Sequence, residues 1–260
     1  MSDRERTPET EQDGPSPETA ANTALDFGRR GFMGAAVAGL GAAFGMGQVA
    51  ADHGSDDPTI PEILNYALTL ERLEAAYYRN ALASSGGVFD ETAVETSEVA
   101  RYFDRPTLRY STYQHFEDIR DHEVYHVAAL ESTLDSLGAA VTAPTADEFV
   151  LPDGVYDSVD SFVGFAQVVE DLGVSAYAGA APYLAKAELE AQDGNVMDLQ
   201  VTPIALGIHS IEARHAGYVR TLTLQRPWPF GTDDDVADVA VDDPRSMGEV
   251  LEVAGDYIDG

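Results

Sequence analysis

Apolar residues recur at steps of three and four along four long segments of the chain, which is the pattern of amphipathic helices. These segments are residues 60 to about 83, about 106 to 137, 158 to about 191, and about 202 to 224. In the second segment Phe116, Ile119 and Val127 fall on one face, and the pattern stops at Gly138. No stretch shows the alternating polarity of a sheet. The pattern therefore predicts an all-α fold.

A long connection, residues 139–156, separates the second and third predicted helices and contains Pro144, Pro152 and Gly154. Such a crossover lets these two helices run parallel in a four-helix bundle. A short helix is expected in the first connection, over residues 91–103. We assign residues 52–230 to the bundle. Residues 231–260 are expected to form an acidic linker and a short helix, at 247–258, that packs on the bundle.

The N-terminal segment differs from the rest of the chain. Residues 1–26 are polar and acidic without apolar periodicity, so disorder is expected there. Arg29 and Arg30 then precede a Gly/Ala-rich run that ends at Ala51, which resembles a twin-arginine export signal. Cleavage is expected before Asp52, with an uncleaved anchor as the alternative. Residues 1–51 are thus predicted to direct export, by the twin-arginine machinery, to the cell surface or medium.

Composition narrows the set of partners. Acidic residues outnumber Lys and Arg by 46 to 15, giving a net charge of −31, and Lys186 is the only lysine. Such a surface disfavours nucleic acid and anionic membranes. It suits near-saturated salt, where screening suppresses self-repulsion, so we expect a halophilic protein rather than an ordinary acidic one. With no cysteine, any metal must be held by carboxylate and imidazole.

Each long helix carries a glutamate where its apolar stripe predicts a hydrocarbon side chain. These residues are Glu71, Glu123, Glu170 and Glu212. A buried carboxylate is costly unless it is paired, protonated or bound to metal. The four glutamates are therefore candidates for a shared site in the bundle core.

Two of these glutamates are followed three residues later by histidine, in the pairs Glu123/His126 and Glu212/His215. Two single glutamates and two Glu-x-x-His pairs form the ligand set of di-iron and di-manganese carboxylate bundles. The halves of the chain also agree beyond the ligands, because Tyr78 and Tyr177 each follow the single glutamate by seven residues. The sequence predicts a site for two iron or manganese ions.

Several neighbours of the predicted ligands are open to two interpretations. Glu74 is an alternative to Glu71 as the ligand from the first helix. Its counterpart in the second half of the chain is Gly173, so we expect Glu74 to lie beside the ligands or in solvent. Tyr78 and Tyr177 are either core residues or hydrogen-bond donors to ligand carboxylates. His209, one turn before Glu212, is an extra ligand, a proton shuttle or a satisfied edge histidine.

A competing motif overlaps the second helix. His122, Glu123 and His126 match the zinc-protease pattern, in which two histidines bind zinc and the glutamate acts as a general base. No third ligand with a known downstream spacing follows. The motif would also leave the other predicted ligands buried without a role, so the di-metal interpretation is favoured.

Residues 58–258 resemble the ferritin-like superfamily and, within it, the subgroup of plant desiccation-related proteins and their prokaryotic relatives. The resemblance rests on residues 63–78, both Glu-x-x-His pairs, residues 170–177 and the short C-terminal helix. It implies a bridged di-iron or di-manganese site that reacts with dioxygen, peroxide or Fe²⁺. Rubrerythrin-like peroxidases use a cysteine-ligated iron, which this chain lacks. Ferroxidation and peroxide disproportionation both remain open.

The expected function is that of an exported di-metal protein in which Glu123 and Glu212 bridge the ions and Glu71 and Glu170 are terminal ligands. The rival hypothesis is a non-catalytic, stress-protective envelope protein whose site is structural or vacant. An oligomer is compatible with the sequence, but a ferritin-like cage is not implied.

Overall fold

The computed structural model describes residues 57–101, 110–192, 194, 199–228 and 242–258. The predictions for residues 1–51, including Arg29 and Arg30, and for the linker at 231–241 lie outside this part of the chain. The described residues form seven α-helices with short 3₁₀ segments and no β-strand beyond isolated bridges. None of these helices is both long and apolar enough to cross a membrane.

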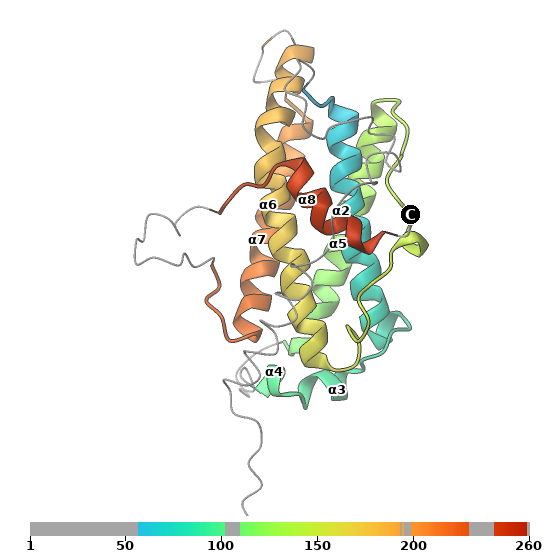
Figure 1. Cartoon of the computed structure of the whole chain (residues 1–260), viewed down its shortest axis with the longest axis vertical. Helices are drawn as coiled ribbons and strands as arrows, with labels where there is room; N and C mark the ends of the chain where they lie inside the picture. The colour runs from blue at the N-terminus through green and yellow to red at the C-terminus, as the bar shows by residue number, and fades with distance from the viewer. Residues whose placement is uncertain (1–56, 102–109, 193, 195–198, 229–241, 259–260) are drawn as a thin grey trace, which may run out of the picture.

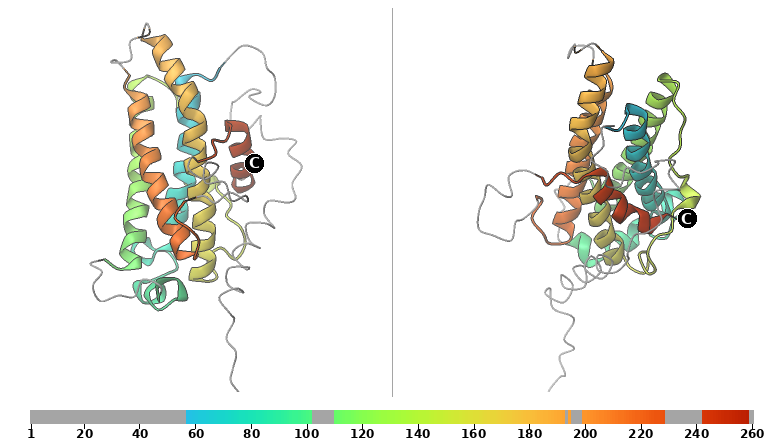
Figure 2. Two further views of the ribbon diagram at one scale, coloured as in Figure 1. Left: turned by 90° about the vertical axis from the view of Figure 1, so that its left-hand side faces the viewer. Right: turned by 45° about the horizontal axis from the view of Figure 1, so that its top comes forward.

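Four long helices form a bundle, which confirms the predicted fold class (Figures 1 and 2). They are α2 (Ile60–Ala81), α5 (Thr112–Ser136), α6 (Val159–Ala191) and α7 (Val201–Leu222). Helix α2 packs against α5, and α6 packs against α7. Contacts of α2 with α6 and of α5 with α7 close the bundle.

The ends of two long helices differ from the prediction. The second helix was expected from residue 106; residues 106–109 are not described, and α5 begins at Thr112. Ser111 has an extended backbone and caps α5, since its side chain accepts a hydrogen bond from the backbone N–H of Gln114 at 3.2 Å. Helix α7 ends at Leu222 rather than at 224, because Leu224 adopts a left-handed φ of 60°.

Helix α7 has no N-cap side chain of its own, because Gln200 makes no side-chain cap hydrogen bond. Glu188, near the end of α6, takes that role. Its carboxylate accepts hydrogen bonds from the backbone N–H groups of Gln200, of Val201 at 2.7 Å and of Thr202 at 2.8 Å. A carboxylate at a helix N-terminus also complements the helix dipole. One side chain thus joins α6 to the start of α7.

Two short helices replace the single helix expected at 91–103. They are α3 (Glu91–Glu95) and α4 (Glu98–Arg101), at one end of the bundle (Figure 1). The break occurs because the Ser97 hydroxyl accepts the backbone N–H of Ala100 at 3.3 Å and so starts a new helix. Residues 102 and 103 are outside the described part.

The connection between α5 and α6 is the predicted long crossover, and it is fixed to α2. Asn65 accepts the backbone N–H of Thr142 at 2.6 Å, and Arg72 donates to the carbonyl oxygen of Ala143 at 2.7 Å. A short 3₁₀ segment, Ala146–Glu148, also packs on α2. These bonds satisfy backbone groups of a segment that has little regular structure of its own.

The C-terminal helix α8 (Met247–Ala254) lies across α6, and a 3₁₀ turn, Gly255–Tyr257, ends it before the expected residue 258 (Figure 2). Gly179 on α6 makes the approach of the chain possible. A Cβ at this position would come within 1.8 Å of the carbonyl oxygen of Arg245. The Arg245 N–H donates to the carbonyl of Ser175 at 3.1 Å. The absence of one side chain therefore lets α8 cover the bundle.

The hydrophobic core is divided into two clusters with a polar layer between them. On α2 the residues before Glu71, from Ile63 to Leu70, belong to one cluster, and those after it, from Leu73 to Leu82, belong to the other. The first cluster is largely aliphatic, whereas the second is rich in Tyr and Phe. The predicted metal ligands lie in the layer between these clusters, where apolar packing shields them from water.

Candidate metal centre

The four long helices bring the six predicted ligands together in the middle of the bundle. The four glutamates are 0% exposed, His126 is 8% exposed and His215 is 5% exposed. The residues form two groups of four, and in each group one ligand atom per residue lies within 4.8 Å of the others. The groups are Glu71, Glu123, His126 and Glu212, and Glu123, Glu170, Glu212 and His215. Glu123 and Glu212 are common to both, where the sequence predicted the bridging ligands.

Both histidines point Nδ1 at the carboxylates. His126 Nδ1 lies 3.1 Å from Oε2 of Glu71, 3.1 Å from Oε2 of Glu123 and 3.2 Å from Oε1 of Glu212. His215 Nδ1 lies 2.9 Å from Oε1 of Glu123. It is also 3.4 Å from Oε2 of Glu170 and 3.8 Å from Oε1 of Glu212. Each half of the site therefore contains one imidazole and three carboxylates.

Several of these atoms are buried without a hydrogen-bond partner, although they lie close together. They are Glu123 Oε1, Glu170 Oε2, both carboxylate oxygens of Glu212, and His215 Nδ1. Buried polar atoms are normally satisfied, so the exceptions need a cause. Ligands at about 2.1 Å from an octahedral ion are about 3 Å from each other. These five atoms lie close to one another without hydrogen-bond geometry. That arrangement is expected of ligand atoms that point at shared ions.

The pKa values in the centre reflect the burial of four carboxylates beside two imidazoles. Burial raises the pKa of Glu71 to about 7, and it raises the pKa values of Glu170 and Glu212 as well. Burial likewise opposes ionisation of Glu123, but the two histidines outweigh it and lower its pKa to about 2. For His126, burial opposes the charged form, yet the surrounding carboxylates raise its pKa to about 12. Binding of a cation by these groups would therefore be coupled to the release of protons from them.

Tyr78 and Tyr177 make the hydrogen bonds that one interpretation of the sequence predicted, and they do so crosswise. The hydroxyl of Tyr78, on α2, donates to Oε1 of Glu170 on α6 at 2.5 Å. The hydroxyl of Tyr177, on α6, donates to Oε1 of Glu71 on α2 at 2.5 Å. Each tyrosine therefore fixes one oxygen of the glutamate that it meets, and the other oxygen of that glutamate faces the histidine of the same half of the centre.

Glu74 is buried beside the ligands, which excludes the solvent-exposed alternative. It is 2% exposed, it belongs to neither group of four, and its Oε2 has no hydrogen-bond partner. Burial, followed by the charge of Glu212, raises its pKa well above the ordinary value. Gly173 stands opposite, because a Cβ there would lie 3.0 Å from Oε2 of Glu212 and 3.2 Å from Oε1 of Glu74. The glycine makes room for both carboxylates.

His122, which the competing zinc-protease interpretation made a metal ligand, instead contacts a predicted ligand of the di-metal centre. Its Nδ1 lies 2.9 Å from Nε2 of His215, and the two rings stack with centroids 5.2 Å apart. The contact holds the His215 ring in the orientation that directs Nδ1 at the carboxylates. No periodicity signals such a contact, because His122 belongs to the exposed edge of α5.

The zinc-protease interpretation does not fit this geometry. His122 belongs to neither group of possible ligands and lies at the far nitrogen of His215, whereas His126 faces the carboxylates. His209 also belongs to neither group. Its Nε2 is buried without a hydrogen-bond partner, one helical turn from Glu212.

The bundle and its six convergent side chains define a helical protein with a buried carboxylate and histidine centre that fits two metal ions. The model of the ferritin-like domain family matches residues 60–225, from α2 to α7, and the chain belongs to that family. A comparison with curated proteins found no match to the chain.

Proposed function

We propose that this chain is an exported protein that binds two iron or manganese ions and reacts with dioxygen, peroxide or Fe²⁺. The observation that carries the proposal is the pair of buried ligand groups that share Glu123 and Glu212. Carboxylates common to two groups would hold two cations side by side, where both could act on one small substrate. Two such ions supply one-electron redox chemistry when bound.

The protein residues have separate roles in this proposal. Glu71 and Glu170 are terminal ligands, and the tyrosine hydroxyl on each holds it in place. His126 and His215 complete the two halves through Nδ1. The apolar clusters on either side keep bulk water from the centre, which strengthens the interaction between the carboxylates and a cation.

The source of electrons limits the reactions. The chain has no cysteine and so carries no thiolate-ligated iron as an internal donor. In ferroxidation, two Fe²⁺ substrates give two electrons that, with two protons, reduce one O₂ to H₂O₂. In disproportionation, two H₂O₂ yield one O₂ and two H₂O. Neither reaction needs a further donor, so both belong to the proposal.

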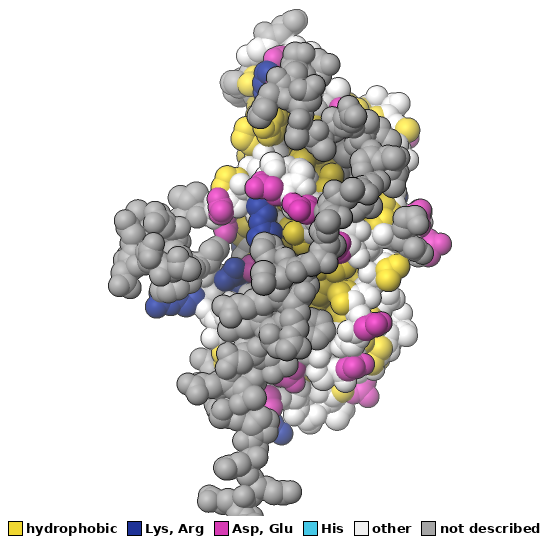
Figure 3. Space-filling view, viewed as in Figure 1, with side chains coloured by type: hydrophobic (Ala, Val, Ile, Leu, Met, Phe, Trp, Pro, Cys, Tyr) yellow, Lys and Arg dark blue, Asp and Glu magenta, His cyan; other side chains and the backbone are white. Residues whose placement is uncertain are grey.

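The cellular setting is proposed from the sequence. Arg29 and Arg30 support export by the twin-arginine machinery, and the relatives that the sequence resembles are the plant desiccation-related proteins. The net charge of −31 supports a protein adapted to concentrated salt. On the face drawn in Figure 3, acidic side chains are dispersed over the described surface, as solvation in salt requires.

The test is anaerobic loading with Fe²⁺ or Mn²⁺ in high salt, followed by assays of dioxygen uptake, Fe²⁺ oxidation and peroxide decomposition. We expect Glu123→Gln to lose the paired site and the reactions. Glu117→Gln, the same change on an outer position of α5, is expected to retain both. Tight metal binding in the wild type without any of these reactions would contradict the proposed chemistry and support the non-catalytic alternative.

A further inference from the structure

One outer face of the bundle lacks the acidic side chains that the other helices carry on their surfaces. Helix α7 contains a single acidic residue, Glu212, and this residue is 0% exposed. Each of the other six described helices exposes at least one Asp or Glu. In a chain with 46 acidic residues and a net charge of −31, the outer side of α7 is therefore an exception.

The adjoining side of α5 continues this face. His122 of α5 contacts His215 of α7, and Tyr125 lies on the same side of α5 because it follows His122 by three residues. From His122 to its last turn, α5 has one acidic residue besides the ligand. That residue is Glu131, whose carboxylate is 2.6 Å from the guanidinium of Arg72 on α2. In the left view of Figure 2, no described segment crosses in front of α5 or α7.

The exposed side chains of this face are of the kinds found at the centres of protein interfaces. Tyr125 is 72% exposed, Leu206 is 50% exposed and Ile204 is 40% exposed. Arg214 is exposed as well. Interface centres are enriched in Tyr and Arg and depleted in Asp, Glu and Lys. We call this surface the acid-free face and define it by Tyr125, Ile204, Leu206, Ser210, Ala213 and Arg214.

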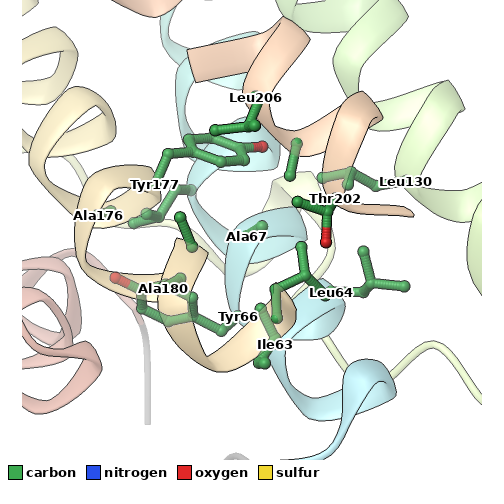
Figure 4. Close-up of a pocket in the computed structure, with 14 residues that line it drawn as sticks. Ile63, Leu64, Tyr66, Ala67, Leu130, Ala176, Tyr177, Ala180, Thr202 and Leu206 are labelled. Atoms are coloured by element: carbon green, nitrogen blue, oxygen red, sulfur yellow. The ribbon is translucent and has the colours of Figure 1, made fainter. Parts of the chain in front are cut away.

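At Leu206 the acid-free face joins the interior of the bundle. The side chain lines a hollow of about 20 Å³ whose walls are mainly Ala and Leu side chains from all four long helices (Figure 4). Leu206 thus has apolar neighbours on its inner side, while half of its surface is exposed. A second apolar surface on the outer side would remove that half from water.

We propose that a second copy of this chain docks on the acid-free face, so that α7 of one copy crosses α7 of the other about a two-fold axis. A basic partner finds no carboxylate on this face, and an acidic partner meets only Arg214. Two copies that met through any other described helix would place exposed carboxylates in the contact. About a two-fold axis at α7 the face meets itself, so this cost is avoided.

The dimer also covers the side on which the metal centre is least shielded. The four ligand glutamates are 0% exposed, whereas His126 is 8% exposed and His215 is 5% exposed. The rings of these two histidines lie 6.3 Å apart where α5 and α7 meet, next to the exposed His122. A second copy on the acid-free face therefore separates the histidine side of the centre from bulk water.

Sedimentation equilibrium of the full-length protein in high salt tests the association. The expected mass is that of two chains, each of 27.8 kDa. Ala213→Glu places a carboxylate in the acid-free face and is expected to raise the dissociation constant about 30-fold or more. In concentrated salt this effect comes from desolvation of the carboxylate, because repulsion between the copies is screened. Ala93→Glu, the same change on an exposed position of α3, is expected to leave the dissociation constant unchanged.

Crosslinking provides a second test that does not depend on the folding of Ala213→Glu. The chain has no cysteine, so Ser210→Cys supplies one thiol per copy in the middle of the outer side of α7. A short bis-maleimide is expected to join two copies of this variant. Ser84→Cys, at an exposed position outside the acid-free face, is the matched control and is expected to remain uncrosslinked.

Three results would overturn the proposal. They are a wild-type protein that stays monomeric in high salt, equal dissociation constants for Ala213→Glu and Ala93→Glu, and equal crosslinking of Ser210→Cys and Ser84→Cys. None of these measurements depends on bound metal. A failure of the dimer therefore leaves the proposed metal chemistry standing, and a failure of the metal chemistry leaves the dimer standing.

Discussion

Replacing Gly173 with Ala tests how tightly the carboxylates are packed in the metal centre. The new Cβ would lie 3.0 Å from Oε2 of Glu212 and 3.2 Å from Oε1 of Glu74. The shorter distance is 0.4 Å less than the 3.4 Å at which ordinary contact begins. Glu212 is 0% exposed, so its carboxylate has little free space into which to move. We therefore expect the substitution to displace a ligand that both halves of the site share.

The magnitude follows from two opposing effects. Alanine in place of glycine stabilises a helix by about 0.5 to 1 kcal/mol, whereas crowding in a packed core costs about 1 to 3 kcal/mol. Gly207, on α7, is the matched control because nothing lies within 4 Å of its added Cβ. Denaturant unfolding in high salt is expected to show Gly207→Ala as more stable than wild type. Gly173→Ala is expected to be less stable than that control by about 1 to 3 kcal/mol.

Metal affinity gives the second measurement on the same pair. Anaerobic calorimetric titration with Mn²⁺ is expected to show about 10- to 100-fold weaker binding for Gly173→Ala and unchanged binding for Gly207→Ala. Equal stability and equal affinity in the two variants would refute the claim that Gly173 makes room for the carboxylates.

Three further predictions address neighbouring side chains. Glu188→Gln is expected to lower the free energy of unfolding by about 1 to 3 kcal/mol at neutral pH. Burial opposes ionisation of Glu188, but the hydrogen bonds from backbone N–H groups outweigh burial and lower the pKa of Glu188 below 4.5. This contribution is present above pH 4.5 and is lost as the pH falls through the lowered pKa. The unfolding free energies of wild type and variant are therefore expected to converge in acid. A difference between them that stays constant with pH would contradict the prediction. His122→Ala is expected to weaken metal binding about 10- to 100-fold because His215 loses its orienting partner, and an unchanged titration would rule out that role. Tyr78→Phe is expected to lower the stability of metal-free protein by about 0.5 to 1.5 kcal/mol through its bond to Glu170, and an unchanged melting temperature would argue against the bond.

The bundle and the position of the candidate ligands could be predicted from the sequence because they depend on helical periodicity. Glu123 and His126 share a face at a spacing of three whatever the tertiary structure, and the same holds for Glu212 and His215. Four inward glutamates require a common interior, which only a bundle provides. The second half of the chain repeats the first, and this separated Glu71 from the nearby Glu74.

The contacts that could not be predicted depend on how the helices are placed against one another. His122 meets His215 because of the rotation and crossing of α5 and α7, which the sequence of either helix does not specify. Glu188 caps a helix that begins 13 residues later, so no local capping motif marks it. Gly179 has a role only because Arg245 approaches it from a distant segment. The start of α5 was missed for a different reason. Ser111 is a local N-cap signal, but the apolar pattern obscured it.

The central claim is that Glu123 and Glu212 join two metal sites within one bundle, and metal content tests it most directly. Elemental analysis of the protein, purified in high salt from its native source without added metal, is predicted to give two iron or manganese ions per chain. No bound metal, together with failure to take up Fe²⁺ or Mn²⁺ anaerobically, would contradict the account.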